Sequence, residues 1–174
     1  MSDSALLREA IRDVPDFPKP GIIFKDITPV LLDPRLFGLT TRGMARPYQD
    51  AGVTRVVAIE SRGFMFGAPV ALDLGAGLVP VRKPGKLPSL RERVEYELEY
   101  GTDALEMHAD AIGAHDRVLI VDDVLATGGT AEAASRLVRG RGATIAGFSF
   151  LIELGFLNGR DRLAPLRVET LIRY

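Results

Sequence analysis

The fold of this chain is decided by the stretch Arg117-Val118-Leu119-Ile120-Val121-Asp122-Asp123-Val124-Leu125-Ala126-Thr127-Gly128-Gly129-Thr130. Four consecutive apolar residues, 118–121, predict a strand that is buried on both faces, as in parallel sheets. Two carboxylates follow at its carboxyl end, and a loop of small residues leads into a predicted helix over 131–138. This order is typical of α/β proteins, whose ligands bind at the carboxyl edge of the sheet.

The loop after this strand has the residue types of an anion-binding site. Gly128 and Gly129 lack a Cβ, so the backbone can turn tightly and bring its N–H groups close to a ligand. Thr127 and Thr130 add hydroxyl groups, and the start of a helix adds unpaired N–H groups and the positive end of its dipole. The loop therefore predicts a phosphate site.

Asp122 and Asp123 would repel that phosphate, so they need a different partner. Vicinal hydroxyl groups, or a divalent cation that bridges hydroxyls, suit carboxylates that only accept hydrogen bonds. A phosphorylated sugar satisfies both halves of the stretch. The alternative is a helix start with capping threonines and two solvated acids, which the complete run of residues disfavours.

Composition excludes several other classes of protein. The 174 residues suffice for a single domain, and 47% hydrophobic with 26% charged residues is the usual mix of a globular protein. A net charge of −1 gives no reason to expect nucleic acid as a partner, and the absence of cysteine excludes disulfides and thiolate metal sites. His108 and His115 are expected in exposed loops. The N-terminal residues do not resemble a signal peptide and no apolar run could cross a membrane, so a cytoplasmic protein is expected.

The remaining elements are predicted from periodicity and from proline and glycine positions. Helices are expected over 4–14, 34–50 and 64–74, and a proline-rich loop over 14–21 precedes a short extended piece at 22–27. Strands are expected over 53–60, 77–82, 117–124, 143–154 and 167–174. Strands that alternate with helices predict a central, mostly parallel sheet flanked by helices.

Residues 83–89 interrupt this alternation and introduce a different element. From Val94 to Tyr100, apolar residues alternate with Glu95, Glu97 and Glu99, which predicts a half-exposed strand. A second extended piece at 104–107 would complete a β-hairpin arm.

Three more stretches, together with residues 118–130, carry a resemblance to a known family. They are Pro15-Asp16-Phe17-Pro18-Lys19-Pro20-Gly21-Ile22-Ile23-Phe24-Lys25-Asp26-Ile27-Thr28-Pro29, Glu60-Ser61-Arg62-Gly63-Phe64, and Arg82-Lys83-Pro84-Gly85-Lys86-Leu87-Pro88 with Leu98-Glu99-Tyr100-Gly101. In this order, from about residue 15 to 154, they resemble the adenine phosphoribosyltransferases, a family of type I phosphoribosyltransferases. The resemblance implies one domain over 1–174, with a small base-recognition hood at about 1–32 and a flexible hairpin arm.

The resemblance also implies a reaction and its participants. The phosphoribosyl group of 5-phosphoribosyl 1-diphosphate would be transferred to adenine N9, giving AMP and pyrophosphate in purine salvage. Mg²⁺ would enter with the diphosphate, and no protein residue is assigned as a direct ligand of the metal. Arg82 would reach the site of a neighbouring subunit, which implies a homodimer.

Residue roles follow from the same resemblance. Asp122 and Asp123 would bind the ribose hydroxyls, and Phe24 would stack on adenine with Leu154 on the other face. The other assignments are the 5′-phosphate loop (Ala126, Thr127, Gly128, Gly129, Thr130), the pyrophosphate site (Ser61, Arg62, Arg82, Lys83, Lys86), the backbone at the amino edge of adenine (Ile23, Lys25) and the catalytic groups (Glu99, Arg62, Lys86). A cis peptide bond is expected at Glu60–Ser61.

Several assignments keep an alternative. Glu97 shares the exposed face of Glu99, and spacing alone does not separate them as the acid/base near adenine N7. Lys83 and Lys86 could be solvated loop lysines, Arg62 a surface arginine, and Phe24 a core aromatic. For the whole chain the alternatives are a related enzyme for another base, and a regulator that binds nucleic acid. The balance of 22 basic and 23 acidic residues disfavours the regulator, and the missing G-x-x-x-x-G-K-[ST] run disfavours a kinase.

Overall fold

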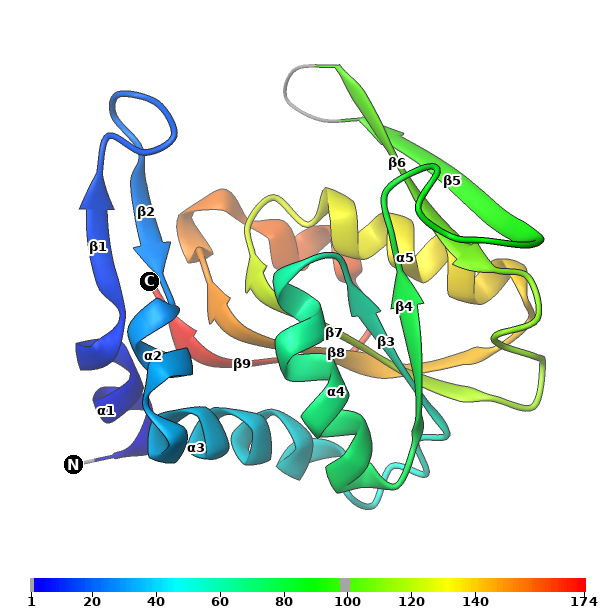
Figure 1. The fold of residues 1–174 in the computed structure, drawn as a ribbon, viewed down its shortest axis with the longest axis horizontal. Coiled ribbons are helices and arrows are strands. Elements are labelled where there is room, and N and C mark those ends of the chain that lie inside the picture. The colour runs from blue at the N-terminus through cyan, green and yellow to red at the C-terminus, as the bar shows by residue number, and fades with distance from the viewer. Residues whose placement is uncertain (1, 98–100) are drawn as a thin grey trace.

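A computed structural model describes residues 2–97 and 101–174, so Leu98, Glu99 and Tyr100 lie outside the described residues. Its centre is a five-stranded parallel sheet in the order β4-β3-β7-β8-β9 (Figure 1). The strands are β3 (Arg55–Ile59), β4 (Gly77–Val81), β7 (Arg117–Leu125), β8 (Thr144–Glu153) and β9 (Val168–Arg173). The predicted parallel α/β sheet is confirmed.

Strand β7 is buried on both faces, as its run of apolar residues predicts. Val118 and Ile120 pack into the cluster that contains the helix α5 (Gly129–Gly140). Leu119 and Val121 pack on the other face, in the cluster with α3 (Pro34–Ala45) and α4 (Arg62–Leu74). Helices thus cover both faces of the sheet, and the carboxyl ends of its strands stay open for a ligand.

The N-terminal segment forms a separate small hairpin beside the sheet. Helix α1 (Asp3–Ala10) leads into β1 (Arg12–Pro15), which pairs antiparallel with β2 (Ile23–Asp26), and α2 (Thr28–Leu32) follows. The helix predicted over 4–14 is therefore wrong beyond Ala10, because residues 12–15 gain the ladder of hydrogen bonds to β2. The same pairing corrects the predicted loop at its first two residues. Figure 1 shows this hairpin and the arm rising at opposite ends of the carboxyl edge.

The arm is a two-stranded antiparallel hairpin of β5 (Arg91–Glu97) and β6 (Thr102–His108). Along β5, Val94 is half-buried and Tyr96 buried while Glu95 and Glu97 are exposed, which confirms the predicted alternation over 94–97; its remainder, 98–100, lies outside the described residues. Backbone hydrogen bonds between Arg82 and Glu106 attach the arm to the end of β4.

Short elements complete the chain. A 3₁₀ turn, η1 (Arg46–Tyr48), replaces the last turn of the helix predicted over 34–50, and η2 (Gly155–Leu157) and η3 (Gly159–Leu163) link β8 to β9. His115 is exposed in a loop as expected, whereas His108 ends β6, is half-buried and contacts the Pro88 carbonyl. In the described part of the chain, no helix is long and apolar enough to cross a membrane.

Candidate active site

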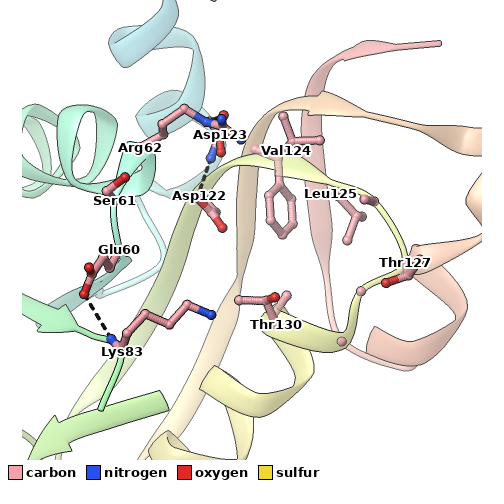
Figure 2. Close-up of a pocket in the computed structure, with 15 residues that line it drawn as sticks. Glu60, Ser61, Arg62, Lys83, Asp122, Asp123, Val124, Leu125, Thr127 and Thr130 are labelled. Atoms are coloured by element: carbon pink, nitrogen blue, oxygen red, sulfur yellow. Dashed lines mark hydrogen bonds and ion pairs between the residues drawn. The ribbon is translucent and has the colours of Figure 1, made fainter. Parts of the chain in front are cut away.

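A polar cavity of about 390 Å³ opens at the carboxyl edge of the sheet (Figure 2). It lies between the turn after β3, the loop before α5 and the ends of β7 and β8. Its described lining residues are Glu60, Ser61, Arg62, Lys83, Asp122, Asp123, Val124, Leu125, Ala126, Thr127, Gly128, Gly129, Thr130, Ala131 and Phe150. The fold therefore brings the two predicted acids, the whole predicted phosphate loop and part of the predicted pyrophosphate group to one cavity.

The loop between β7 and α5 depends on close backbone packing. Gly128 stands before α5 with φ +84°, a conformation that glycine adopts without strain. A Cβ on Gly128 would lie 2.5 Å from the Gly159 carbonyl oxygen, and a Cβ on Gly159 would collide with the Ala126 carbonyl oxygen. The role of Gly159 has only one sequence signal, the turn dipeptide Asn158-Gly159. Gly159 supports the loop from behind.

Asp122 is held by its neighbours on β7 and α4. The Asp123 N–H donates a hydrogen bond of 2.9 Å to Asp122 Oδ1. A Cβ on Gly63, in the first turn of α4, would lie 2.9 Å from the same oxygen and 3.0 Å from the Val121 carbonyl oxygen. Burial, followed by the nearby charge of Asp123, raises the pKa of Asp122 well above its ordinary value. Asp122 therefore binds a proton more readily than a carboxyl group in water does.

Asp123 connects the pair of acids, through Arg62, to the ring that is predicted to stack on adenine. Its carboxylate is buried and accepts a 2.5 Å hydrogen bond from Arg62 Nε. The guanidinium carbon of Arg62 lies 5.3 Å from the centre of the Phe24 ring, within the range of a cation–π contact. Arg62 therefore contacts both an acid of the predicted ribose site and the predicted stacking ring.

Glu60 organises the cations on the other side of the cavity. Its carboxylate accepts a hydrogen bond from the Lys83 N–H at 3.0 Å and from Arg82 Nε at 3.2 Å, and it pairs with Lys86. Burial alone would raise the pKa of Glu60, but the hydrogen bonds from Lys86 and Lys83 outweigh it and lower the pKa. The following peptide bond, Glu60–Ser61, is cis, as the resemblance implied.

Each of the four predicted pyrophosphate-binding cations has a carboxylate partner. Arg62 pairs with Asp123, Lys83 pairs with Asp103, and both Arg82 and Lys86 pair with Glu60. Arg62 and Lys83 line the cavity, whereas Arg82 and Lys86 are connected to it through Glu60. No sequence pattern indicated Glu60 and Asp103 as partners, because a contact between residues distant in the chain has no sequence signature.

The residues predicted to bind adenine are divided between two sides of β2. Ile23, Lys25 and Leu154 line a second, mainly apolar cavity of about 470 Å³, together with Gly21, Ile22, Phe156, Leu157 and Tyr174. Phe24 lies between Ile23 and Lys25 on the strand, so its side chain points the opposite way, toward Arg62. The predicted acid/base, Glu99, lies outside the described residues.

A divalent cation would find few protein ligands here. Among the described residues, no group of three or more His, Asp or Glu side chains could hold a metal ion. Asp122 and Asp123 alone leave most of the coordination positions of a hard cation open for oxygens of a substrate or water. This donor set fits a metal that enters already bound to a phosphate ester.

Comparisons with known proteins agree with this geometry. Residues 41–168 match the model of the phosphoribosyl transferase domain. The adenine phosphoribosyltransferase of Myxococcus xanthus is 59% identical over 168 residues, which cover 97% of this chain and 91% of that protein. The crystal structure of adenine phosphoribosyltransferase from Rhodothermus marinus matches with a TM-score of 0.94 and 55% identity, and covers 99% of this chain and 98% of that one.

A third match carries information about ligands. The structure of the Saccharomyces cerevisiae adenine phosphoribosyltransferase, complexed with D-2,5-dideoxy-2,5-imino-altritol 1,6-bisphosphate and adenine, matches with a TM-score of 0.92 and 41% identity. The match covers 97% of this chain and 98% of the yeast chain.

Proposed function

Because this chain belongs to the phosphoribosyl transferase family, we propose that its cavity carries out the reaction for which its relatives are named. It transfers the 5-phosphoribosyl group of 5-phosphoribosyl 1-diphosphate to adenine, giving AMP and pyrophosphate, which is a purine salvage reaction. The observation that carries this proposal is one cavity that places two adjacent acids beside a glycine-rich loop at a helix start.

The two acids suit the ribose. Asp122, whose pKa is raised, can donate a hydrogen bond to a sugar hydroxyl, and Asp123, which pairs with Arg62, can accept one. As the diphosphate leaves, positive charge develops at C1 of the sugar. Fixed negative charge close to this carbon would stabilise the transition state more than the ground state. Residues Ala126, Thr127, Gly128, Gly129 and Thr130 would bind the 5′-phosphate through backbone N–H and hydroxyl groups.

The leaving diphosphate requires cations, and we assign Ser61, Arg62, Arg82, Lys83 and Lys86 to it. Mg²⁺ bound to the diphosphate would neutralise part of its charge, with Asp122 and Asp123 nearest to the metal or to the hydroxyls that it contacts. These cations would contact phosphate oxygens in place of, or in addition to, the carboxylates that now hold them. Arg62 and Lys86 are the cations that we assign to catalysis, since charge on the leaving oxygens increases in the transition state.

We assign Phe24 to one face of adenine and Leu154 to the other. Because the two side chains lie on different sides of β2 here, adenine between them would require one of them to rearrange. Stacking on an aromatic ring contributes roughly 1–3 kcal/mol per base but scarcely distinguishes bases. Backbone groups of Ile23 and Lys25 would therefore read the amino edge, and Glu99 would exchange a proton with N7. Three of these five proposed contacts, Ile23, Phe24 and Lys25, lie in the hood over residues 1–32, which we therefore assign as the base-recognition part of a single domain.

A homodimer is also proposed, because Arg82 acts in a neighbouring subunit in the family that the motif resembles. In this chain Arg82 Nε lies 3.2 Å from Glu60 Oε2 of its own chain, so an action in the neighbour would require exchange of this partner.

The direct test is incubation of the protein with adenine, 5-phosphoribosyl 1-diphosphate and Mg²⁺, followed by chromatographic detection of AMP. Hypoxanthine, guanine, xanthine and orotate in parallel reactions test the choice of base. We expect AMP to form and the other nucleotides to form at least about 100-fold more slowly, since a site built to pair with polar groups rejects bases that leave them unpaired. Faster turnover of another base would contradict the proposal. The Asp123→Asn variant serves as the matched control for contaminating activity.

A further inference from the structure

Tyr96 connects three parts of the site through its hydroxyl group. The residue lies on β5, and its side chain is buried in the cluster between the sheet and α5. Lys83 Nζ donates a hydrogen bond of 3.0 Å to the hydroxyl oxygen, and Thr130 Oγ1 lies 3.4 Å from it. The hydroxyl itself donates to Asp103 Oδ2 at 3.3 Å.

These three contacts use the whole hydrogen-bonding capacity of a phenol. A hydroxyl group has one donor and two acceptor positions. Here Asp103 takes the donor, and Lys83 and Thr130 occupy the acceptors. The orientation of the hydroxyl is therefore fixed, and the position of the Lys83 ammonium is fixed with it.

Lys83 is held at both ends. Its backbone N–H donates to Glu60, and its ammonium group pairs with Asp103 and Tyr96. Figure 2 shows the side chain extending across the cavity toward Thr130. An ammonium group has three donors, and the contacts to Asp103 and Tyr96 use two of them, so one remains for a ligand in the cavity. Burial alone would lower the pKa of Lys83, but Asp103 and Tyr96 outweigh it and raise the pKa, so the amine stays charged.

We propose that Tyr96 is a positioning residue: its hydroxyl holds the Lys83 ammonium at the end of the cavity where Thr130 and the 5′-phosphate loop lie. Lys83 then contributes to binding of the phosphoribosyl group as well as to binding of the leaving diphosphate. This inference rests on the proposed function, because it names a further contact for the same substrate. It assigns the arm a role in substrate binding through Tyr96 and Asp103, which pair with each other next to the last described pair of the hairpin, Glu97 and Thr102.

The hydroxyl can be separated from the ring. Tyr96→Phe keeps the buried ring and removes only the atom that contacts Lys83, Asp103 and Thr130. We expect the KM for 5-phosphoribosyl 1-diphosphate to rise about five- to tenfold, the effect of losing one typical hydrogen bond. The KM for adenine should stay within about twofold of the wild type, since Tyr96 lies on the phosphate side of the cavity.

The matched control is Tyr48→Phe. Tyr48 is also buried, and its hydroxyl donates a 2.7 Å hydrogen bond to the Phe148 carbonyl oxygen, within the core on the other face of the sheet. This variant should lose stability without a change in either KM. It therefore shows what the loss of a buried phenol hydroxyl does when only the fold is affected.

A double-mutant cycle with Lys83→Met tests whether Tyr96 acts through the lysine. If it does, Tyr96→Phe should change the KM for the sugar diphosphate by less than about twofold once Lys83 is absent. Fully additive effects would overturn the inference, and so would an equal rise of both KM values in Tyr96→Phe.

Titration calorimetry with ribose 5-phosphate separates this inference from the proposed function, because it needs no turnover. Tyr96→Phe should weaken binding about five- to tenfold, and Tyr48→Phe should not. Absence of AMP formation by the wild type would refute the proposed function alone. Equal binding by the wild type and Tyr96→Phe would refute the positioning role alone.

Discussion

The adjacent acids Asp122 and Asp123 differ in environment, and this difference predicts different mutational effects. Asp123 pairs with Arg62, so Asp123→Asn removes a charge that stabilises the developing positive charge on the sugar. We expect turnover to fall about 100-fold or more, equivalent to roughly 2.7–4 kcal/mol. Asp122→Asn should cost less, because an amide resembles the protonated carboxyl that a raised pKa favours. Steady-state kcat values of both variants check this order, and equal losses would contradict it.

The position of Gly63 against Asp122 predicts that Gly63→Ala loses activity but still folds. A Cβ at this position would come within 2.9 Å of Asp122 Oδ1, so Gly63→Ala must displace the carboxyl group or the first turn of α4. We expect kcat to fall about tenfold or more, since small displacements of reacting groups are costly.

Gly140→Ala is the control for Gly63→Ala, because nothing lies within 4 Å of a Cβ at this other helical glycine. It should leave kcat unchanged and raise stability by up to about 1 kcal/mol. Unchanged kcat in Gly63→Ala would show that Asp122 tolerates the shift.

The choice between Glu97 and Glu99 stays a prediction. Glu97 is exposed at the end of β5, opposite Thr102, and Glu99 lies outside the described residues. We expect Glu99→Gln to reduce turnover by about 100-fold or more and Glu97→Gln to have little effect, since general acid–base catalysis contributes 10²–10⁴-fold. Comparable losses of kcat in the two variants would show that the assignment to Glu99 is wrong.

At the residue scale, the sequence predicts site residues most reliably where they are adjacent in the chain and belong to one strand end and loop. Asp122, Asp123 and the loop through Thr130 adjoin each other in the chain, and all of them line the cavity. Gly159 and Asp103 could not be found in this way, because their roles are contacts across the fold with Ala126 and Lys83. The extended piece predicted over 22–27 does imply that Ile23 and Phe24 face opposite sides, but which of them faces the cavity depends on how β2 packs in the fold.

At the scale of elements, Glu153 at the end of β8 forms hydrogen bonds that connect β8 to η3 and to β9. Its buried carboxylate accepts two hydrogen bonds from Arg160, at 2.6 and 3.1 Å, and one from Thr170 at 3.1 Å. The hydrogen bonds from Arg160 lower the pKa of Glu153 from its ordinary value of 4.5, against the effect of burial. This cluster holds the segment that contains Leu154 and Gly159 against the sheet.

The Glu153 cluster predicts a pH dependence of stability. A carboxylate whose pKa is lower in the folded than in the unfolded chain stabilises the fold above the unfolded value of 4.5, and this stabilisation is lost as the pH falls through the folded pKa. Glu153→Gln should therefore reduce the free energy of unfolding by about 2 kcal/mol at pH 7, and by progressively less below pH 4.5. Urea denaturation at several pH values measures this difference. A difference that is independent of pH would contradict the role of the charge.

Elements were predictable where the hydrophobic period was strong. All five strands of the central sheet and the helices α3, α4 and α5 correspond to predicted elements, with ends that shift by a few residues. Residues 12–14 are predicted as helix because Ile11 and its predecessors follow a helical period. Pairing with β2, a long-range contact, overrides this local preference. The short α2 was not predicted, since five residues contain too little of a period.

At the scale of the whole molecule, the sequence predicted the layered architecture but not the placement of the hood and arm around the carboxyl edge. Alternation of strands and helices is sufficient for a parallel sheet with covered faces. The directions in which the two hairpins project depend on packing against α3, α5 and the sheet, which no local pattern encodes.

The proposed homodimer predicts complementation between two inactive variants. Arg82→Ala and Asp123→Asn would each disable the enzyme, but in a mixed dimer one site would combine an intact Asp123 with an intact Arg82 of the other subunit. After mixed refolding at equal amounts we expect about a quarter of wild-type activity, because half of the dimers are mixed and half of their sites are intact. Sedimentation velocity reports the dimer itself. No recovery of activity from a dimeric mixture would show that Arg82 acts within its own chain.

The carboxylate partners of the four cations have a consequence for the speed of substrate capture. An active site whose positive groups are already compensated produces only a weak long-range field, so it does little to guide a polyanion from solution by electrostatic steering. The association rate of the sugar diphosphate should therefore change little between low and moderate ionic strength, whereas its residence time, set by direct ion contacts, should shorten. Selectivity between anions would therefore arise after an anion has reached the site. It would depend on how strongly the oxygens of that anion bind each arginine and lysine in competition with the carboxylates.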